Sequence, residues 1–362
     1  MPHFTEFNTN PPFPTDVPVA KLECISLAQL RGGNEAESDA LFDACKNDGF
    51  FLLDLRGDEQ GEKILSDAGS LFDVGRTLFD FPYDVKMQCV MGGARSVFGH
   101  NLNLSYKAVG LSKVDAEGTP DRCEFYGISK DDLLGLSAHL PAPAIIDSKR
   151  DLFTAFLTAN HSLEQLVLSH LEKHLRLPAG ALTSLHPLDR LSGDQVRILK
   201  YDPQPRQDRR TSLVPHTDFG SVTSLFNILG GLQVLPIGRQ NVEANWRYVR
   251  PRTGCAIINL GDSMVKWSNG LLKSAMHRVT YAPGKQADAT RWSLAYFGHA
   301  HNKSSMKRME GSDVIPPLED GTLEEDMTAE DWLYVRSTSY KQKDMKEFER
   351  VVGKDEPVPV VE

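Results

Sequence analysis

The chain of 362 residues lacks several features that define whole classes of protein. Its five cysteines are scattered and show no CxxC spacing, which excludes a disulfide framework and a zinc knuckle. No stretch approaches the roughly 18 apolar residues that a membrane-spanning helix needs. The start of the chain has no basic segment followed by an apolar one, so it is not a signal peptide. We therefore expect a cytoplasmic protein with reduced thiols and no membrane partner.

Positive charge is also in short supply. Lys and Arg number 40 against 49 Asp and Glu, which gives a net charge of −9. A nucleic-acid-binding protein would favour a basic face, so we expect no nucleic-acid partner. Otherwise the composition, 40% hydrophobic and 25% charged, is typical of a globular protein. No obligate protein partner is evident, and a small molecule is the expected ligand.

The first half of the chain alternates between helical and extended patterns. Apolar residues at helical spacing predict helices near residues 34–49, 64–79 and 147–177. The short apolar run that begins at Phe50 predicts a buried strand, and the stretch from Gly92 to Lys130 predicts hairpins and loops. A further helix is predicted near residues 327–351. We expect a mixed helical region, 1–192, packed on the domain that follows.

From Gly193 onward the pattern changes to short β-rich runs separated by turn residues. They read "DQVRILKY", "SVTSLFNIL", "GLQVLP", "WRYVR", "CAIINL", "MVKWS", "SAMHRVTY" and "RWSLAYFG". About eight short strands with this punctuation predict an antiparallel sandwich or jelly roll. The fold class is therefore mostly β with flanking helices. The core spans 193–310 and a helical extension spans 311–362, all in one compact unit.

The run "VPHTDFGSV" places two possible metal ligands, His216 and Asp218, two residues apart. On a strand this spacing directs both side chains to the same face. His277, in "SAMHRVTY", is a candidate third ligand. Two histidines and one carboxylate can occupy one face of a six-coordinate metal and leave three positions open, as in non-haem Fe(II) oxygenases. Zinc sites are usually four-coordinate with other ligand sets.

A candidate anion site follows in "RWSLAYF". Arg291 and Ser293 are again two residues apart, so a guanidinium and a hydroxyl share one strand face. An arginine fork can bind a carboxylate through two hydrogen bonds. The phenol of Tyr201, in "ILKYDP", could donate to the same acid.

Together these runs resemble a known family. The stretches "ILKYDPQP", "VPHTDFGSVTSL", "GGLQV", "AIINLGD", "WSNGLLKSAMHRV" and "RWSLAYF" occur in the order seen in Fe(II)- and 2-oxoglutarate-dependent dioxygenases related to isopenicillin N synthase. "VPVAKL", "DALFDACKNDGFFLL" and "LFDFPYDVKMQ" extend the resemblance to about residues 15–300.

The resemblance implies a double-stranded β-helix core and a set of roles. His216, Asp218 and His277 would bind Fe(II) and carry the catalysis. Arg291 and Ser293 would hold the distal carboxylate of 2-oxoglutarate, and Tyr201 would orient it. The cofactors would be Fe(II), 2-oxoglutarate and O2, with ascorbate as a candidate reductant.

The implied activity is oxidation of a C–H bond of a small organic molecule by hydroxylation, desaturation or ring formation. A specialised metabolite is the expected substrate class. Two alternatives stay open on the sequence alone. One is an oxidase like isopenicillin N synthase, in which the Arg-x-Ser pair holds the substrate's own carboxylate and no 2-oxoglutarate is used. The other is a non-catalytic ligand-binding protein on the same scaffold.

The sequence defines the residues of the substrate pocket less clearly. Candidate walls are four aromatic residues, which could equally pack in the core: Phe98, Tyr106, Phe226 and Phe297. Where many relatives continue "FFxxPN", this chain reads "YFGHAHN", which adds His299 and His301. We expect these two histidines to be structural or to lie at the pocket rim.

Overall fold

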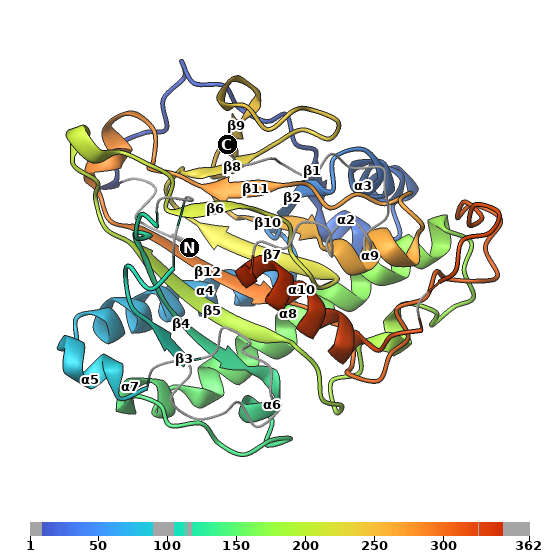
Figure 1. The fold of residues 1–362 in the computed structure, drawn as a ribbon, viewed down its shortest axis with the longest axis horizontal. Helices are drawn as coiled ribbons and strands as arrows, with labels where there is room; N and C mark the ends of the chain where they lie inside the picture. Colours follow the sequence, from blue (N-terminus) through green and yellow to red (C-terminus); the bar gives the residue numbers. More distant parts are fainter. Residues whose placement is uncertain (1–8, 90–104, 113, 115–117, 325, 343–362) are drawn as a thin grey trace.

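The structure is a computed structural model that describes the chain except for residues 1–8, 90–104, 113, 115–117, 325 and 343–362. Its described strands form two sheets (Figure 1). The larger sheet has eight strands in the order β1-β2-β10-β7-β12-β5-β4-β3, and the smaller has four in the order β6-β11-β8-β9. Apart from the β1–β2 pair, which is parallel, the strand pairs are antiparallel.

The bounds of the elements are as follows. The strands are β1 Cys24–Ser26, β2 Phe50–Asp54, β3 Ser105–Lys107, β4 Cys123–Ser129, β5 Gln195–Tyr201, β6 Leu213–His216, β7 Val222–Asn227, β8 Leu232–Val234, β9 Arg247–Tyr248, β10 Cys255–Leu260, β11 His277–Val279 and β12 Arg291–Phe297. The helices are α2 Leu27–Arg31, α3 Glu35–Asn47, α4 Glu59–Phe79, α5 Tyr83–Met87, α6 Lys130–Leu133, α7 Ala144–Asp147, α8 Arg150–His174, α9 Asp262–Trp267 and α10 Ala329–Gln342.

Two hydrophobic clusters hold the layers together. One lies between the large sheet and the long helices α4 and α8, and includes Phe72, Phe156 and Leu294. The other lies between the two sheets and includes Phe50, Leu199 and Val279. Alternate residues of a central strand therefore serve different layers, because successive side chains point to opposite faces. On β12, Trp292, Leu294 and Tyr296 face the helices, and Arg291, Ser293, Ala295 and Phe297 face the smaller sheet.

The helices of the first half start and end where the sequence supplies the right polar groups. The Asn34 side chain accepts hydrogen bonds from the backbone N–H groups of Ala36 and Glu37 at the start of α3. The Asp58 side chain caps α4 in the same way through Gly61. Such caps satisfy N–H groups that have no partner within the helix. The first of these helices begins close to its predicted position, and α4 begins at Glu59, five residues before the predicted start at residue 64, because Asp58 caps it there.

The region before residue 193 contributes more β-structure than its helical pattern indicates. It supplies β1 and β2 at one edge of the large sheet and β3 and β4 at the other. The N-terminal residues therefore complete the sheet as well as covering it. The division into 1–192, 193–310 and 311–362 stays a prediction.

The strand predicted at "MVKWS" is wrong, because this segment is the short helix α9. Short apolar runs are ambiguous between strand and helix in a sequence. Here the backbone N–H groups of Asp262 and Ser263 donate to the carbonyl oxygens of Asp218 and Gly220. These bonds direct the chain across the end of the sheet, where Met264 and Trp267 are buried on one face of the helix.

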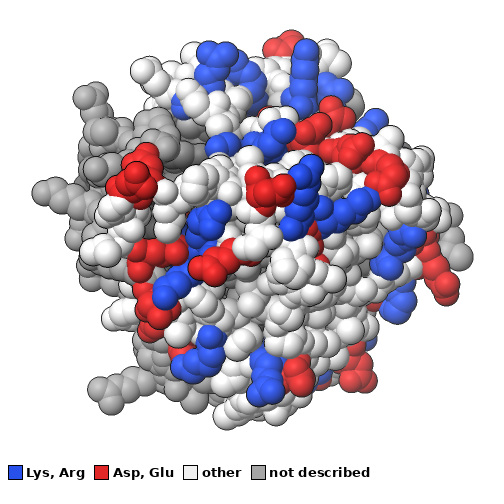
Figure 2. Space-filling model, turned by 90° about the vertical axis from the view of Figure 1, so that its right-hand side faces the viewer, with Lys and Arg blue, Asp and Glu red and all other residues white. Residues whose placement is uncertain are grey.

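Charged residues of both signs are scattered over the side of the molecule shown in Figure 2, among uncharged residues. Lys and Arg side chains alternate there with Asp and Glu, and neither sign forms a continuous field. In the part of the chain that the structure describes, no helix combines the length and the apolar character needed to cross a membrane.

The close packing of α4 against the large sheet gives a test of the fold. A Cβ atom added at Gly75 would lie 2.7 Å from Cγ2 of Ile198 on β5. We expect Gly75→Leu to lower the free energy of unfolding by about 1–3 kcal/mol, the usual cost of overpacking. Urea unfolding measures this change. The control is Ser66→Leu at an exposed position of the same helix, where a change within about 0.5 kcal/mol is expected. Equal stability of the two variants would contradict the close packing of Gly75 against Ile198.

Candidate active site

The three candidate metal ligands come together where β6 and β11 pair. His216 ends β6 and lies directly opposite His277, which begins β11. Asp218 follows two residues after the strand ends, so the strand predicted to carry both ligands is shorter than expected. Potential ligand atoms of the three residues nevertheless lie within 4.8 Å of one another. Nε2 of His277 is 3.8 Å from Oδ1 of Asp218.

Backbone carbonyl groups fix which nitrogen each histidine can offer. Nδ1 of His216 lies 2.8 Å from the carbonyl oxygen of Val214, and Nδ1 of His277 lies 3.1 Å from that of Ala275. A carbonyl oxygen can only accept a hydrogen bond, so both Nδ1 atoms carry the proton. In the tautomer that these contacts select, Nε2 is the nitrogen that can offer a lone pair to a metal.

The carboxylate is oriented in a similar way. Oδ2 of Asp218 accepts hydrogen bonds from Oγ1 of Thr223 and from Nδ2 of Asn259, each at 2.7 Å. Oδ1 therefore faces the two histidines and can serve as a ligand. The sequence pattern does not predict these two partners, because they become neighbours of Asp218 only through the pairing of β7 with β10.

Burial and neighbouring charges shift the pKa values of two residues in this cluster. Burial, reinforced by the neighbouring His277, lowers the pKa of His216 to about 4, so its ring is neutral near pH 7. Burial by itself would raise the pKa of Asp218. The two histidines and the two hydrogen bonds outweigh that effect and hold the pKa below its usual value.

Residues of the C-terminal helix α10 also hold the segment around Asp218 in place. Arg336 of α10 is buried and forms an ion pair with Asp262, which accepts a hydrogen bond from Thr217 at 2.9 Å. Nε1 of Trp332, also on α10, donates to the carbonyl oxygen of Phe219 at 2.9 Å. These contacts fix the residues on either side of Asp218.

Arg291 lies on the same inner face of the large sheet. Its Nε donates to the carbonyl oxygen of Gly230 at 2.8 Å and its Nη1 donates to Oγ of Ser293 at 2.6 Å. Its Nη2 is buried and has no hydrogen-bond partner among the described residues. Tyr201 is the cross-strand neighbour of Arg291, and its ring centroid lies 4.9 Å from the guanidinium carbon.

This arrangement fits the groups that the resemblance implies. Two imidazoles that each direct Nε2 toward the cluster and one carboxylate form a donor set for Fe(II) with open positions. An unpartnered guanidinium nitrogen in the interior is costly unless an acceptor reaches it. A carboxylate of 2-oxoglutarate would supply that acceptor beside the Ser293 hydroxyl.

The candidate pocket aromatics divide between the two faces of the sheet. Tyr106 and Phe226 belong to the cluster beneath the helices, and Phe226 packs edge-on against Phe156 of α8. They lie on the face opposite Arg291 and are core residues. Phe297 faces the same side as Arg291. Phe98 lies outside the described residues.

His299 and His301 lie just after β12, beyond the inner face of the sheet. His299 is held by a backbone hydrogen bond from its N–H group to Asp194 at 2.7 Å. His301 forms an isolated bridge with Ser192, and its N–H group donates to the carbonyl oxygen of Leu185. Neither belongs to the group of three that could hold a metal. These placements support structural roles.

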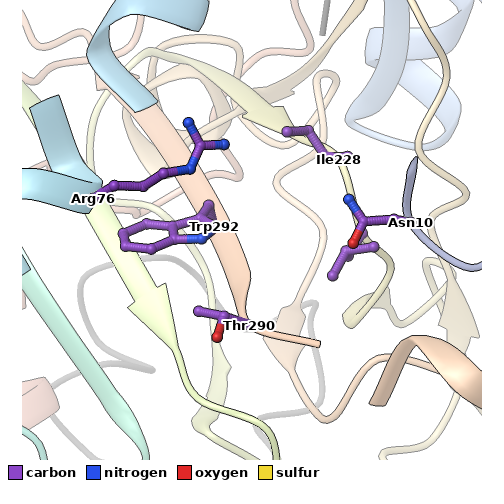
Figure 3. Close-up of a pocket in the computed structure, with 6 residues that line it drawn as sticks. Asn10, Arg76, Ile228, Thr290 and Trp292 are labelled. Carbon is purple, nitrogen blue, oxygen red and sulfur yellow. The ribbon is translucent and has the colours of Figure 1, made fainter. Parts of the chain in front are cut away.

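Two hollows in the described surface lie away from this cluster. One, of about 210 Å³, is lined by Asn10, Arg76, Ile228, Leu229, Thr290 and Trp292 (Figure 3). The other is lined in part by the N-terminal arm, residues 10–13. Thr290 and Trp292 flank Arg291 in the chain, so their side chains point away from its face of the sheet. The three candidate metal ligands border neither hollow.

The orientation of Asp218 can be tested by removing one hydrogen bond. We expect Thr223→Val, which keeps the side-chain shape, to weaken Fe(II) binding roughly 10- to 100-fold, as loss of a partner of a ligand usually does. Anaerobic metal titration measures the affinity. The control is Ser224→Ala on the same strand, because its buried hydroxyl has no hydrogen-bond partner among the described residues. An unchanged affinity in Thr223→Val would show that Asp218 needs no such support.

Buried His186 predicts a pH dependence of stability. Burial lowers its pKa to about 4, while an unfolded histidine titrates near pH 6.5. The unfolded state therefore binds the extra proton first, and stability should fall as pH drops from about 6.5 to 4. Urea unfolding of the metal-free protein across this range measures the slope. We expect His186→Gln to flatten it, and an identical slope in both proteins would contradict the assignment.

Two family models match the chain in succession. Residues 17–142 match the non-haem dioxygenase in morphine synthesis N-terminal family, and residues 193–300 match the 2OG-Fe(II) oxygenase superfamily. A 2-oxoglutarate-dependent dioxygenase of Aspergillus fumigatus is 31% identical over 340 residues, which cover 89% of this chain and 86% of that protein. A second, of Glarea lozoyensis, is 30% identical over 293 residues, covering 81% and 83%.

Solved structures show the same fold. A 2OG-Fe(II) oxygenase family protein of Caulobacter crescentus superposes with a TM-score of 0.70 at 20% identity, covering 89% of this chain and 100% of that one. JOX2 in complex with 2OG, Fe and JA gives a TM-score of 0.65 at 21% identity, covering 90% and 87%. The predicted jelly-roll core with flanking helices is thus confirmed. The chain belongs to the 2OG-Fe(II) oxygenase superfamily and is a non-haem dioxygenase that uses Fe(II), 2-oxoglutarate and O2.

Proposed function

We propose that His216, Asp218 and His277 bind the Fe(II) of this dioxygenase, and that Arg291, Ser293 and Tyr201 bind 2-oxoglutarate. The observation that carries the proposal is the buried Nη2 atom of Arg291, which has no partner among the described residues. It lies beside a hydroxyl, on the sheet face toward which the three metal-capable side chains also converge. A dicarboxylate with one end at the metal and the other at Arg291 would satisfy both groups.

Each part of the chain then has a defined task. Iron, when bound, supplies the oxygen chemistry that cleaves a substrate C–H bond. The Val214 and Ala275 carbonyl groups hold the two histidines in the tautomer that presents Nε2. Thr223 and Asn259 hold Asp218 with one oxygen toward the histidines. Arg291 and Ser293 fix the distal end of the co-substrate, which sets the approach of its keto-acid end.

We propose a small organic molecule as the substrate, and a specialised metabolite as its class. The named fungal relatives and the small ligands bound in solved relatives, thymine and JA among them, support this choice. The reaction would be hydroxylation, desaturation or ring formation. We place the protein in the cytoplasm, since all five cysteines are free in the structure.

Two alternatives lose support. An oxidase that uses no 2-oxoglutarate would share the Arg-x-Ser pair, but three fungal relatives that are 30–31% identical to this chain are named as 2-oxoglutarate-dependent. A non-catalytic binding protein would have no reason to keep the hydrogen bonds that orient all three metal-capable side chains.

An anaerobic titration tests the proposed sites. Metal-free protein receives Fe(II) and then 2-oxoglutarate, and the visible charge-transfer band of the ternary complex is followed. We expect Arg291→Gln to raise the 2-oxoglutarate concentration at half-saturation roughly 10- to 150-fold, because a hydrogen bond to a charged group contributes about 1.5–3 kcal/mol. His277→Ala should abolish the band because iron binding is lost.

The control variant is Arg252→Gln, which removes an exposed positive charge and should leave the titration unchanged. If iron binds without any band in the wild type, the oxidase alternative is favoured. If the band survives unchanged in Arg291→Gln, the co-substrate lies elsewhere.

A further inference from the structure

A second arginine faces the space between the two sheets and is not needed for the roles assigned so far. Arg197 lies on β5 with Tyr201 and Leu199 on the same side of the strand. Its Nη2 donates to Oε1 of Gln195 at 2.9 Å, and its Nε is buried with no partner among the described residues. The ion pairs described in the structure include no carboxylate partner for it. Its charge is therefore uncompensated by a direct contact.

Two aromatic rings hold this guanidinium in place. Its carbon lies 4.5 Å from the ring centroid of Phe125 on β4 and 4.8 Å from that of Phe297 on β12. Cation–π contacts of this kind position a guanidinium without using its N–H groups. Those groups can therefore donate to an acceptor on a ligand.

The sheet register separates Arg197 from the proposed co-substrate site. Ala295 is the cross-strand partner of Arg197, while Tyr201 is the partner of Arg291. Four residues at about 3.4 Å each place the two arginine positions roughly 13 Å apart along the strands. A single dicarboxylate bound to Arg291 therefore does not explain the presence of Arg197.

The same register places Arg197 toward the metal ligands. The neighbouring Phe297 pairs with Thr223, whose hydroxyl binds Asp218. Burial lowers the pKa of Arg197 to about 10, and Asp218 is among the groups whose charge opposes that shift. Arg197 thus stays charged at neutral pH, within electrostatic range of the metal cluster.

The neighbours of Arg197 on this face are small or only partly buried. The direct cross-strand neighbours of Arg197 are Gly127 and Ala295, which carry at most a methyl group. Arg197, Phe297 and Leu225 are only partly buried on this face, although the strands that carry them are central in the sheet. Part of a charged group and part of two apolar side chains are therefore solvent-accessible on the same face of the sheet.

From this geometry we infer that Arg197 is the substrate-recognition residue, and that the substrate is a small carboxylic acid with an apolar body. The carboxylate accepts hydrogen bonds from the guanidinium, and the apolar body contacts Phe297 and Leu225. This inference rests on the proposed function, because it takes the inner face of the sheet as the reacting site. A purely structural role explains the residue less well, since an apolar side chain would fill the same place without the cost of burying a charge.

Binding of matched acids and amides tests the inference without knowledge of the natural substrate. Protein loaded with Mn(II) and saturating 2-oxoglutarate is titrated calorimetrically with 1-naphthoate and with 1-naphthamide, and in parallel with phenylacetate and phenylacetamide. We expect each acid to bind the wild type at least 10-fold more tightly than its amide. In Arg197→Gln this preference should fall below 2-fold, and in Arg197→Lys it should be reduced but retained.

Two controls separate the possible failures. Arg291→Gln should weaken 2-oxoglutarate binding and keep the preference for acids. Each variant must also bind Fe(II) and, except for Arg291→Gln, 2-oxoglutarate as the wild type does, which excludes a folding defect. An acid preference that survives in Arg197→Gln, or equal binding of acid and amide to the wild type, would overturn the inference. Failure of the wild type to bind 2-oxoglutarate would instead refute the proposed function.

Discussion

The close approach of two backbone segments at Gly220 and Gly261 underlies the whole site. A Cβ atom at Gly261 would lie 2.2 Å from the carbonyl oxygen of Gly220, so only glycine allows this contact. It brings the N–H group of Asp262 to the carbonyl oxygen of Asp218, 2.8 Å away. The carboxylate that leaves β6 is thereby turned back toward the two histidines, which are already opposite each other in the ladder. Without this contact between Gly220 and Gly261, the candidate ligand atoms of the three residues would no longer lie close together.

The sequence predicts the parts of the site that follow a local rule. The spacing of Arg291 and Ser293 places them on one face because strands have a period of two, and Nη1 of Arg291 does bond to Ser293. The long helix α8 follows from its apolar stripe. The strand pattern predicts a sandwich or jelly roll and the spacing of His216 and Asp218 suggests a metal site, and the family resemblance adds the double-stranded β-helix and the iron-binding roles. These roles remain predictions.

Features that depend on register could not be predicted. Thr223 and Asn259 lie 36 residues apart in the chain and become partners of Asp218 through strand pairing. The same applies to Tyr106 and Phe226, whose aromatic character fits a pocket or a core equally well. Only their positions in the strand register show that both side chains lie on the face of the sheet that the helices cover. The helical conformation of "MVKWS" likewise depends on hydrogen bonds between the start of α9 and the loop that contains Asp218 and Gly220.

The ion pair between Arg336 and Asp262 joins parts of the chain that are made at very different times. Arg336 follows Asp262 by 74 residues and Thr217 by 119. During synthesis, the whole β-core, with His216, Asp218 and His277, leaves the ribosome before α10 does. The buried Asp262 lacks its arginine until that point. Assembly of the candidate metal site is thus linked to the synthesis of α10, and a chain interrupted before α10 carries the three candidate ligands without the ion pair and hydrogen bonds that fix the residues around Asp218.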